Sequence, residues 1–186
     1  MTRAPILRMA SLLSLTAASS GPAMAQEVFT LTSPVMADGG TLPPDLKCER
    51  DGGDGLSPPI NWTSPPEGTQ GYAIIMHHYP RGRVEGVDAP SHYWLLWNIP
   101  ATTLGLERGN PTSIGDEGSD KDMRRTGYTP PCSPPGPPHQ YTITVYALRA
   151  PLARLPNHDD GDVDREQMIA AMDGLVLGLS ALTFSN

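Results

Sequence analysis

The stretch Gly71-Tyr72-Ala73-Ile74-Ile75-Met76 is a continuous apolar run between turn-forming residues. A short run of this kind predicts a central β-strand that is covered on both faces. A second run extends from Tyr93 to Ile99 and is stopped by Pro100. In a third run, Tyr141 to Leu148, apolar side chains alternate so that Tyr141 shares one face with Ile143, Val145 and Ala147. We expect these three segments to form the heart of one sheet.

The composition predicts a mainly β protein with many turns. The chain of 186 residues contains 21 prolines and 19 glycines, which favour short strands and shaped loops over long helices. A helix is predicted only near the end, where Asp164 can cap it with Gln167 three residues on. The apolar stripe of this helix is expected to pack on the core, and its residues are Met168, Ile169, Met172 and Leu175.

The first 25 residues are interpreted as a cleaved secretory signal. Arg3 and Arg8 are followed by a short apolar stretch, and Ala23-Met24-Ala25 forms a small-x-small cleavage site before Gln26. The apolar stretch has about ten residues, whereas a membrane-spanning helix needs about 20. We therefore expect an exported protein, periplasmic or secreted, with one domain over residues 26–186 and no transmembrane segment in the mature chain.

Charge and cysteine content narrow the function classes. The formal charge is −7, and removal of Arg3 and Arg8 makes it −9. An acidic chain without a basic run is not expected to bind nucleic acid or to adhere strongly to an anionic membrane. Cys48 and Cys132 are expected to form a disulfide, because the chain leaves the cytoplasm. Two buried free thiols are the alternative, and a two-cysteine metal site lacks the usual spacing.

Three separated motifs carry a resemblance to a known family. The first, Leu56-Ser57-Pro58-Pro59-Ile60-Asn61-Trp62, is followed by Pro65-Pro66-Glu67-Gly68-Thr69. The second is Trp94 to Ala101, and the third is Gly127-Tyr128-Thr129-Pro130-Pro131-Cys132 with His139-Gln140-Tyr141 downstream. In order and spacing these motifs resemble the phosphatidylethanolamine-binding protein family, bacterial Raf-kinase-inhibitor-like branch, over about residues 28 to 180.

This resemblance implies an antiparallel β-sandwich with Greek-key topology and short C-terminal helices. It also implies a pocket for phosphate-like groups at one end of the central sheet, with cis-proline bonds in its rim. By motif match, His139 and Tyr141 are the strongest candidates for ligand binding, and Gly127 and Tyr128 belong to the same box. For His139 the alternative is a surface loop residue, and for Tyr141 it is ordinary sheet core.

Two departures from the family pattern concern the pocket. The family places a D-P-D-A-P turn after the central strand, whereas this chain has His77-His78-Tyr79-Pro80 and an extra segment, Arg81 to Val87. An imidazole, His78 or His77, thus stands where a carboxylate is expected. Tyr93 replaces the usual strand histidine, and His92 precedes it. Neighbours in a strand point to opposite faces, so both cannot enter the pocket without a bulge.

The function predicted from these residues is a non-catalytic binding protein for a small anionic or phosphorylated ligand, with no cofactor. A protein-interaction or inhibitor module is an alternative, with Arg81 to Val87 and the charged loop from Gly105 to Arg125 as its contact surface. A metal site is a third hypothesis, because His77, His78, His92 and His139 could lie near one pocket. No nucleophile motif is present, and Cys132 is better explained as half of a disulfide.

Overall fold

A computed structural model describes residues 27–109, 114–134 and 136–186. The expected signal segment, residues 1–25, lies outside the described residues. The strands are β1 Thr30–Thr32, β2 Gly40–Thr41, β3 Ile60–Thr63, β4 Gly71–His78, β5 Ser91–Pro100, β6 Gly105–Leu106, β7 Asp116–Glu117, β8 Gln140–Leu148 and β9 Val176–Ser185. The helices are the two 3-10 turns η1 Pro44–Leu46 and η2 Glu49–Asp51 and the α-helix α1 Arg165–Met172.

The strands form two sheets. One has the order β1-β3-β6, and the other has the order β2-β9-β8-β4-β5-β7. Within the larger sheet, β8 returns to pair with β4, while β4, β5 and β7 follow one another. This order, fourth-first-second-third, is a Greek key, with β6 placed in the other sheet on the way. The pairs are antiparallel except β2, which runs parallel to β9. The predicted mainly β sandwich is confirmed.

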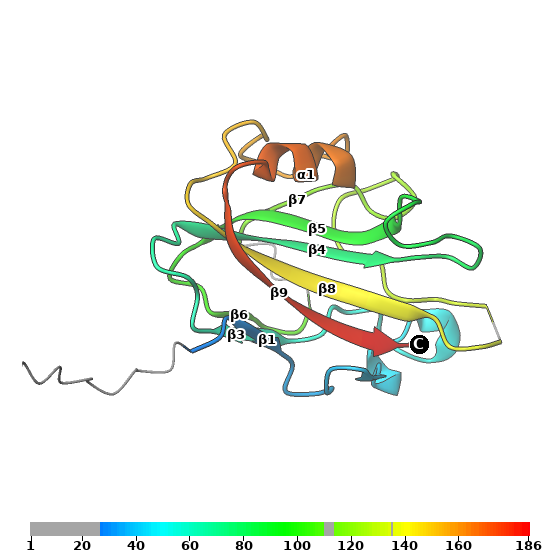
Figure 1. Ribbon diagram of the computed structural model, residues 1–186. Coiled ribbons are helices and arrows are strands. Elements are labelled where there is room, and N and C mark those ends of the chain that lie inside the picture. Colours follow the sequence, from blue (N-terminus) through cyan, green and yellow to red (C-terminus); the bar gives the residue numbers. More distant parts are fainter. Residues whose placement is uncertain (1–26, 110–113, 135) are drawn as a thin grey trace, which may run out of the picture.

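The larger sheet is covered on both faces, which explains its continuous apolar strands. Figure 1 shows the small sheet on one side of it and α1 on the other. Along β4, Tyr72, Ile74 and Met76 pack between the sheets, whereas Ala73 and Ile75 face the α1 side. Each fully buried side chain of the larger kind contributes about 1.5–3 kcal/mol.

The helix α1 begins at the predicted cap, but fewer of its residues pack on the core than predicted. The Asp164 carboxylate accepts from the Gln167 backbone N–H, and the Gln167 side chain accepts from the Asp164 N–H. Met168 and Met172 are buried, but Ile169 is 39% exposed. The predicted stripe is therefore wrong at Ile169, because the helix has only eight residues and rests one narrow face on the sheet. Within the described residues α1 is the only α-helix, and it is followed by β9.

The segment from Gly105 to Arg125 is not the uniformly exposed loop that its charge predicts. It contributes β6 and β7, and Glu117, Ser119 and Asp120 are buried. Hydrogen bonding explains this burial, since each of these polar side chains has a partner. Among the described residues, no helix has the length and hydropathy to cross a membrane.

Candidate functional site

A bulge in β5 decides which side chains reach the end of the sheet. Met76 pairs with Trp94 and His77 pairs with His92, so Tyr93 is an extra residue in β5. Tyr93 and Trp94 therefore both face the core between the sheets. His92 stays in register with His77 on the opposite face. The sequence left open whether Tyr93 or His92 faces the core between the sheets, and in the structure Tyr93 does so.

Four rings meet where β4 ends and β8 begins, and we call His78, Tyr93, His139 and Tyr141 the ring cluster. The His78 ring stacks on Tyr141 with 4.7 Å between centroids, and it lies 5.0 Å from His139. Tyr93 stands edge-on to Tyr141 at 5.0 Å. Phe184 of β9 stacks on the far side of Tyr141 at 5.6 Å. Aromatic packing on both sides thus fixes the orientation of the Tyr141 ring.

Hydrogen bonds assign the tautomers of the two histidines. His78 Nδ1 lies 2.8 Å from the carbonyl oxygen of Gln140 and must donate to it, because a carbonyl only accepts. In a neutral His78, Nε2 is then an acceptor. His139 Nδ1 lies 3.1 Å from this Nε2 and therefore carries the proton that joins the two rings. The remaining nitrogen, His139 Nε2, is the ring nitrogen of the pair that is left for a ligand.

The surroundings of the ring cluster combine hydroxyl groups with basic side chains. The hydroxyls of Ser133 and Tyr141 are 2.9 Å apart. Lys121 Nζ lies over the Tyr93 ring, 5.9 Å from its centroid. The His78 ring also borders a cavity of about 270 Å³, which is lined by His77, His78, Tyr79, Arg83, Glu85, Gln140 and Thr142. The cluster can therefore offer hydroxyl and imidazole donors next to positive charge.

Burial favours the neutral forms of His78 and Tyr93. Burial lowers the pKa of His78, the hydrogen bond to Gln140 opposes this shift, and the charges of His139 and Lys121 add to it. Burial, with the neighbouring Tyr141, raises the pKa of Tyr93 far above its usual range. Tyr93 thus stays a phenol at neutral pH, and His78 resists protonation.

Two of the predicted site histidines lie elsewhere. His77 faces the opposite side of the sheet from His78, although it borders the same cavity at the strand end. Burial, with the charge of Arg165, lowers the pKa of His77 to about 4. His92 Nε2 lies 3.0 Å from Ser119 Oγ and 3.1 Å from the carbonyl oxygen of Asp120. Alternation along β4 and β5 thus divides the four histidines into two pairs, His78 with His139 on one face of the sheet and His77 with His92 on the other.

The chain is similar in sequence to one known family of proteins. A family profile described as "Phosphatidylethanolamine-binding protein" matches residues 32–185. This chain belongs to the phosphatidylethanolamine-binding protein family. The UPF0098 protein of Chlamydia trachomatis is 28% identical over 155 residues, which cover 82% of this chain and 94% of that protein. A mycobacterial relative, named "Putative lipoprotein LppC" in Mycobacterium tuberculosis, is 30% identical over 73% of this chain and 63% of its own length.

Solved structures agree with this family. A phosphatidylethanolamine-binding protein homologue from Chlamydia trachomatis superposes with a TM-score of 0.71 at 27% identity, over 85% of this chain and 96% of that one. YbcL of Escherichia coli gives a TM-score of 0.70 at 22% identity, over 84% and 96% of the two chains, and supports the fold alone. One implied family feature differs here, since none of the described peptide bonds is cis.

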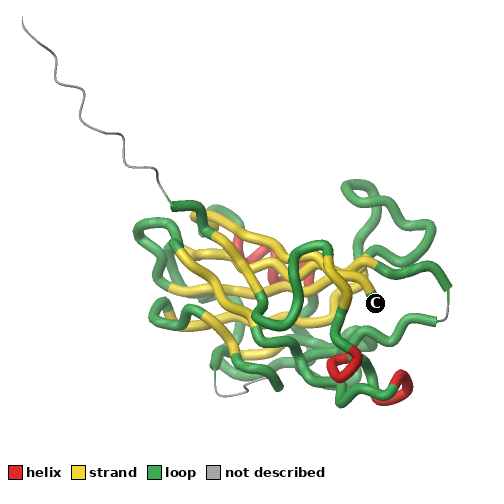
Figure 2. Tube along the Cα trace, turned by 90° about the horizontal axis from the view of Figure 1, so that it is seen from below, coloured by secondary structure: helices red, strands yellow, loops and turns green. Residues whose placement is uncertain are grey.

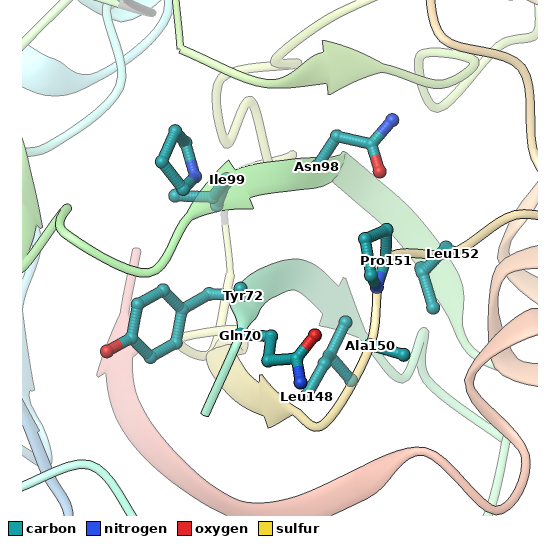
Figure 3. A pocket seen from close by; sticks show the side chains of 10 residues that line it. Gln70, Tyr72, Asn98, Ile99, Leu148, Ala150, Pro151 and Leu152 are labelled. Carbon is teal, nitrogen blue, oxygen red and sulfur yellow. The ribbon is translucent and has the colours of Figure 1, made fainter. Parts of the chain in front are cut away.

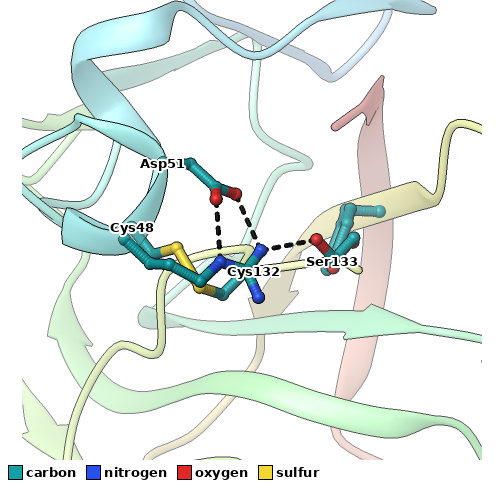
Figure 4. Close-up of a disulfide and its surroundings, with 6 residues drawn as sticks. Cys48, Asp51, Cys132 and Ser133 are labelled. Atoms are coloured by element: carbon teal, nitrogen blue, oxygen red, sulfur yellow. Dashed lines mark hydrogen bonds and ion pairs between the residues drawn. A yellow bond between two sulfur atoms is a disulfide. The ribbon is translucent and has the colours of Figure 1, made fainter. Parts of the chain in front are cut away.

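A disulfide joins the segment before β3 to the segment before β8. Cys48 and Cys132 form a disulfide with 5.4 Å between their Cα atoms. Figure 4 shows Asp51 and Ser133 beside it. Arg50 donates to the Asp51 carboxylate and also, from Nη2, to the carbonyl oxygen of Ser133 at 2.6 Å. The 3-10 turns η1 and η2 lie near the end of β9, where β8 begins (Figure 2). The disulfide prediction is confirmed, and the bond holds the segment that carries Ser133.

Gly127 and Tyr128, which the family motif placed in the pocket, pack beside Glu117 and Trp94, and Tyr128 also lines a separate cavity of about 560 Å³. The Tyr128 ring is buried edge-on against Trp94 at 5.7 Å, and its hydroxyl has no hydrogen-bond partner among the described residues. Gly127 has a φ of +101°, and a Cβ there would lie 2.7 Å from Glu117 Oε2. Glu117 is itself buried and accepts from Trp94 Nε1 at 2.9 Å. Close approach to this carboxylate explains the glycine.

Replacement of Gly127 by alanine is therefore expected to lower the free energy of unfolding by more than the cost of a left-handed alanine alone. A left-handed alanine costs about 1–2 kcal/mol, and the contact with Glu117 adds about 1–3 kcal/mol. Gly52→Ala is the matched control, since Gly52 has a φ of +87° with nothing within 4 Å of a Cβ. Urea unfolding of both variants measures the difference. Equal losses of stability would contradict the packing explanation.

A larger apolar cavity lies at the opposite end of the same strands. It has a volume of about 310 Å³ and is shown in Figure 3. Its lining residues are Gln70, Gly71, Tyr72, Asn98, Ile99, Pro100, Leu148, Ala150, Pro151 and Leu152. It contains no histidine, carboxylate or basic side chain. Because the ring cluster combines titratable groups with a neighbouring cation, we regard the ring cluster as the functional candidate.

Two residues beside the ring cluster, Lys121 and Ser133, were not among the predicted site residues. Lys121, one of only two lysines in the chain, belongs to the charged loop from Gly105 to Arg125 that was expected to be exposed. No periodicity brings either residue to the cluster. Among the described residues, the one group of cysteine, histidine or acidic side chains with metal-like spacing is Cys48, Asp51 and Cys132. Both sulfurs of this group are used in the disulfide, and it contains no histidine.

Proposed function

We propose that this protein binds a small phosphate-like anion, without catalysis, at the ring cluster. The observation that carries the proposal is the hydrogen bond between His139 Nδ1 and His78 Nε2, with His78 Nδ1 engaged by Gln140. This chain of donors leaves His139 Nε2 free to take a proton and then donate it to an anion oxygen. The tyrosine and serine hydroxyls of the cluster supply further donors.

The histidine pair can hold one additional proton without breaking its own hydrogen bond. A proton on His139 Nε2 leaves the bond from Nδ1 to His78 intact. A second proton on His78 Nε2 would place two N–H groups against each other, and burial already disfavours it. With one added proton, the histidine pair carries a single positive charge, which favours the binding of an anion. The pair therefore couples anion binding to the uptake of one proton.

This coupling predicts that anion affinity rises as the pH falls. As the pH falls, the affinity for sulfate, a phosphate-like anion that does not itself gain a proton near neutral pH, is expected to rise by up to about tenfold. Isothermal calorimetry in two buffers of different ionisation enthalpy measures both the affinity and the proton uptake. His139→Gln retains hydrogen bonding but cannot hold the proton, so its affinity should be weak and nearly independent of pH. An unchanged pH dependence in this variant would contradict the mechanism.

The ligand preference follows from the imidazole at position 78. The family pattern has a carboxylate near this position, and a carboxylate would favour a ligand ammonium group. With His78 in its place, plain phosphate is expected to bind better than phosphoethanolamine, by about fivefold or more. Competition calorimetry with the two ligands tests this preference. A clear preference for phosphoethanolamine would show that the ammonium group is recognised after all.

Export is part of the proposal. A disulfide persists in oxidising compartments, and a relative from Mycobacterium tuberculosis bears a lipoprotein name. These two observations support a periplasmic or secreted location, in keeping with the signal expected at residues 1–25.

A protein partner is the second candidate function, supported by Val84 and Val87, which are 59% and 81% exposed in the segment between β4 and β5. Serine at both positions should abolish the capture of such a partner without changing phosphate affinity.

A further inference from the structure

The loop between β7 and β8 brings one cation to the ring cluster. Lys121 is exposed, and its Nζ lies over the Tyr93 ring. Its ion pair with Asp122, at 3.2 Å, joins two exposed groups and contributes little stability. The ammonium group is therefore free to exchange Asp122 for a ligand oxygen at small cost.

The backbone of this loop is fixed rather than loose. The buried Asp120 carboxylate accepts from the backbone N–H groups of Asp122 and Arg124 and from the Arg125 side chain. The Lys121 N–H donates to Thr129 Oγ1 at 3.1 Å, and the Thr129 N–H donates to the carbonyl oxygen of Tyr93 at 2.7 Å. The loop is thus tied directly to the bulge that places Tyr93 in the ring cluster.

His92 fixes the same loop from the other face of the sheet. Ser119 Oγ donates its proton to the carbonyl oxygen of Val163 at 3.0 Å and can only accept from His92. The carbonyl oxygen of Asp120 is likewise an acceptor. His92 Nε2 must therefore carry a proton and share it between these two oxygens, at 3.0 and 3.1 Å. The bulge accordingly sends Tyr93 into the cluster and His92 to the base of the Lys121 loop.

We infer that Lys121 contacts the bound phosphate-like anion, and that His92 is the positioning residue that holds the Lys121 loop over Tyr93. This inference rests on the proposed function and adds a residue that selects for negative charge. Asp122 then competes with the ligand for the Lys121 ammonium. The charge at position 121 also acts on His78, whose pKa it helps to lower.

Amine acylation followed by mass spectrometry tests the contact, because the chain has only two lysines, Lys121 and Lys47. Saturating phosphate should slow acylation of Lys121 by about fivefold or more and leave Lys47 unchanged. Lys121→Met should weaken phosphate binding by about tenfold, and Asp122→Asn should strengthen it by a few-fold. Lys47→Met is the matched control and should bind like the wild type.

The role of His92 needs a readout beyond stability. His92→Ala should weaken phosphate binding by several-fold and abolish the protection of Lys121, whereas His92→Gln, which keeps an N–H donor, should restore part of both. Thermal unfolding of the two variants identifies any general loss of fold. If His92→Ala lowers only the unfolding midpoint and leaves Lys121 protected by phosphate, the positioning role is wrong.

The outcomes separate this inference from the proposed function. If phosphate binds in a manner that depends on His139 while Lys121 acylation and the affinity of Lys121→Met are unchanged, the Lys121 inference fails and the proposed function stands. If phosphate binds neither the wild type nor Asp122→Asn, the proposed function itself fails. Protection of Lys121 together with the loss of affinity in Lys121→Met supports both.

Discussion

Removal of the disulfide by Cys48→Ser with Cys132→Ser is expected to lower the free energy of unfolding by about 3–4 kcal/mol. The bond closes a sequence separation of 84 residues, and the open chain gains that conformational freedom when it unfolds. Removal of the disulfide should also perturb the ring cluster, because Ser133 adjoins Cys132 and its hydroxyl lies 2.9 Å from that of Tyr141. Denaturant unfolding with and without reductant measures the first effect.

The local effect of the disulfide has its own control. Ser133→Ala removes only the hydroxyl contact with Tyr141 and should change stability by about 1 kcal/mol or less. Reductant should destabilise the wild type and Ser133→Ala by similar amounts, and it should have no effect on the double serine variant. A double variant as stable as the wild type would show that the segment around Ser133 is held by its other contacts, such as the hydrogen bond from Arg50.

Acidification is expected to destabilise the fold through His77. The folded-state pKa of His77 is about 4, below its ordinary value of 6.5, chiefly because the ring is desolvated. Protonation therefore favours the unfolded chain: the stability that His77 contributes is present above pH 6.5 and is lost as the pH falls toward 4. Allowing for the partial exposure of the ring, we expect this loss to be about 1–2 kcal/mol.

Comparison with His77→Gln isolates this effect. The variant should lose less stability than the wild type between these pH values, whereas His158→Gln, at an exposed histidine, should behave like the wild type. Glu117 acts in the opposite direction, because burial raises its pKa and its protonation favours the folded state. That contribution is common to all three proteins and cancels in the differences. Parallel pH profiles for the wild type and His77→Gln would contradict the assignment.

The sequence sufficed for the sheet because its central strands are continuous apolar runs. A strand such as β4, which is buried on both faces, has apolar side chains along most of its length, and the family resemblance then implied a Greek-key sandwich. The helix cap at Asp164 could also be predicted, since its partner Gln167 is close to it in sequence. Periodicity failed at Ile169, because nothing in the sequence states how wide a face α1 presents to the sheet.

Only some residues of the ring cluster could be predicted from the sequence, for a physical reason. His139 and Tyr141 were found by motif, but the choice between Tyr93 and His92 depends on a one-residue bulge in β5. A single inserted residue reverses the facing of its neighbours, and hydrophobic periodicity does not mark it in a strand that is apolar throughout. Lys121 and Ser133 reach the cluster through tertiary contacts, which no spacing in the sequence encodes.

The central claim concerns one nitrogen atom, His139 Nε2. Nitrogen-15 NMR of labelled histidine side chains distinguishes a protonated from an unprotonated ring nitrogen in the free protein and after addition of phosphate. The hydrogen-bond chain predicts that His78 remains protonated at Nδ1 alone, while His139, protonated at Nδ1 in the free protein, gains a proton at Nε2 when phosphate binds. Ring nitrogens of His139 that stay unchanged at saturating phosphate would contradict the account.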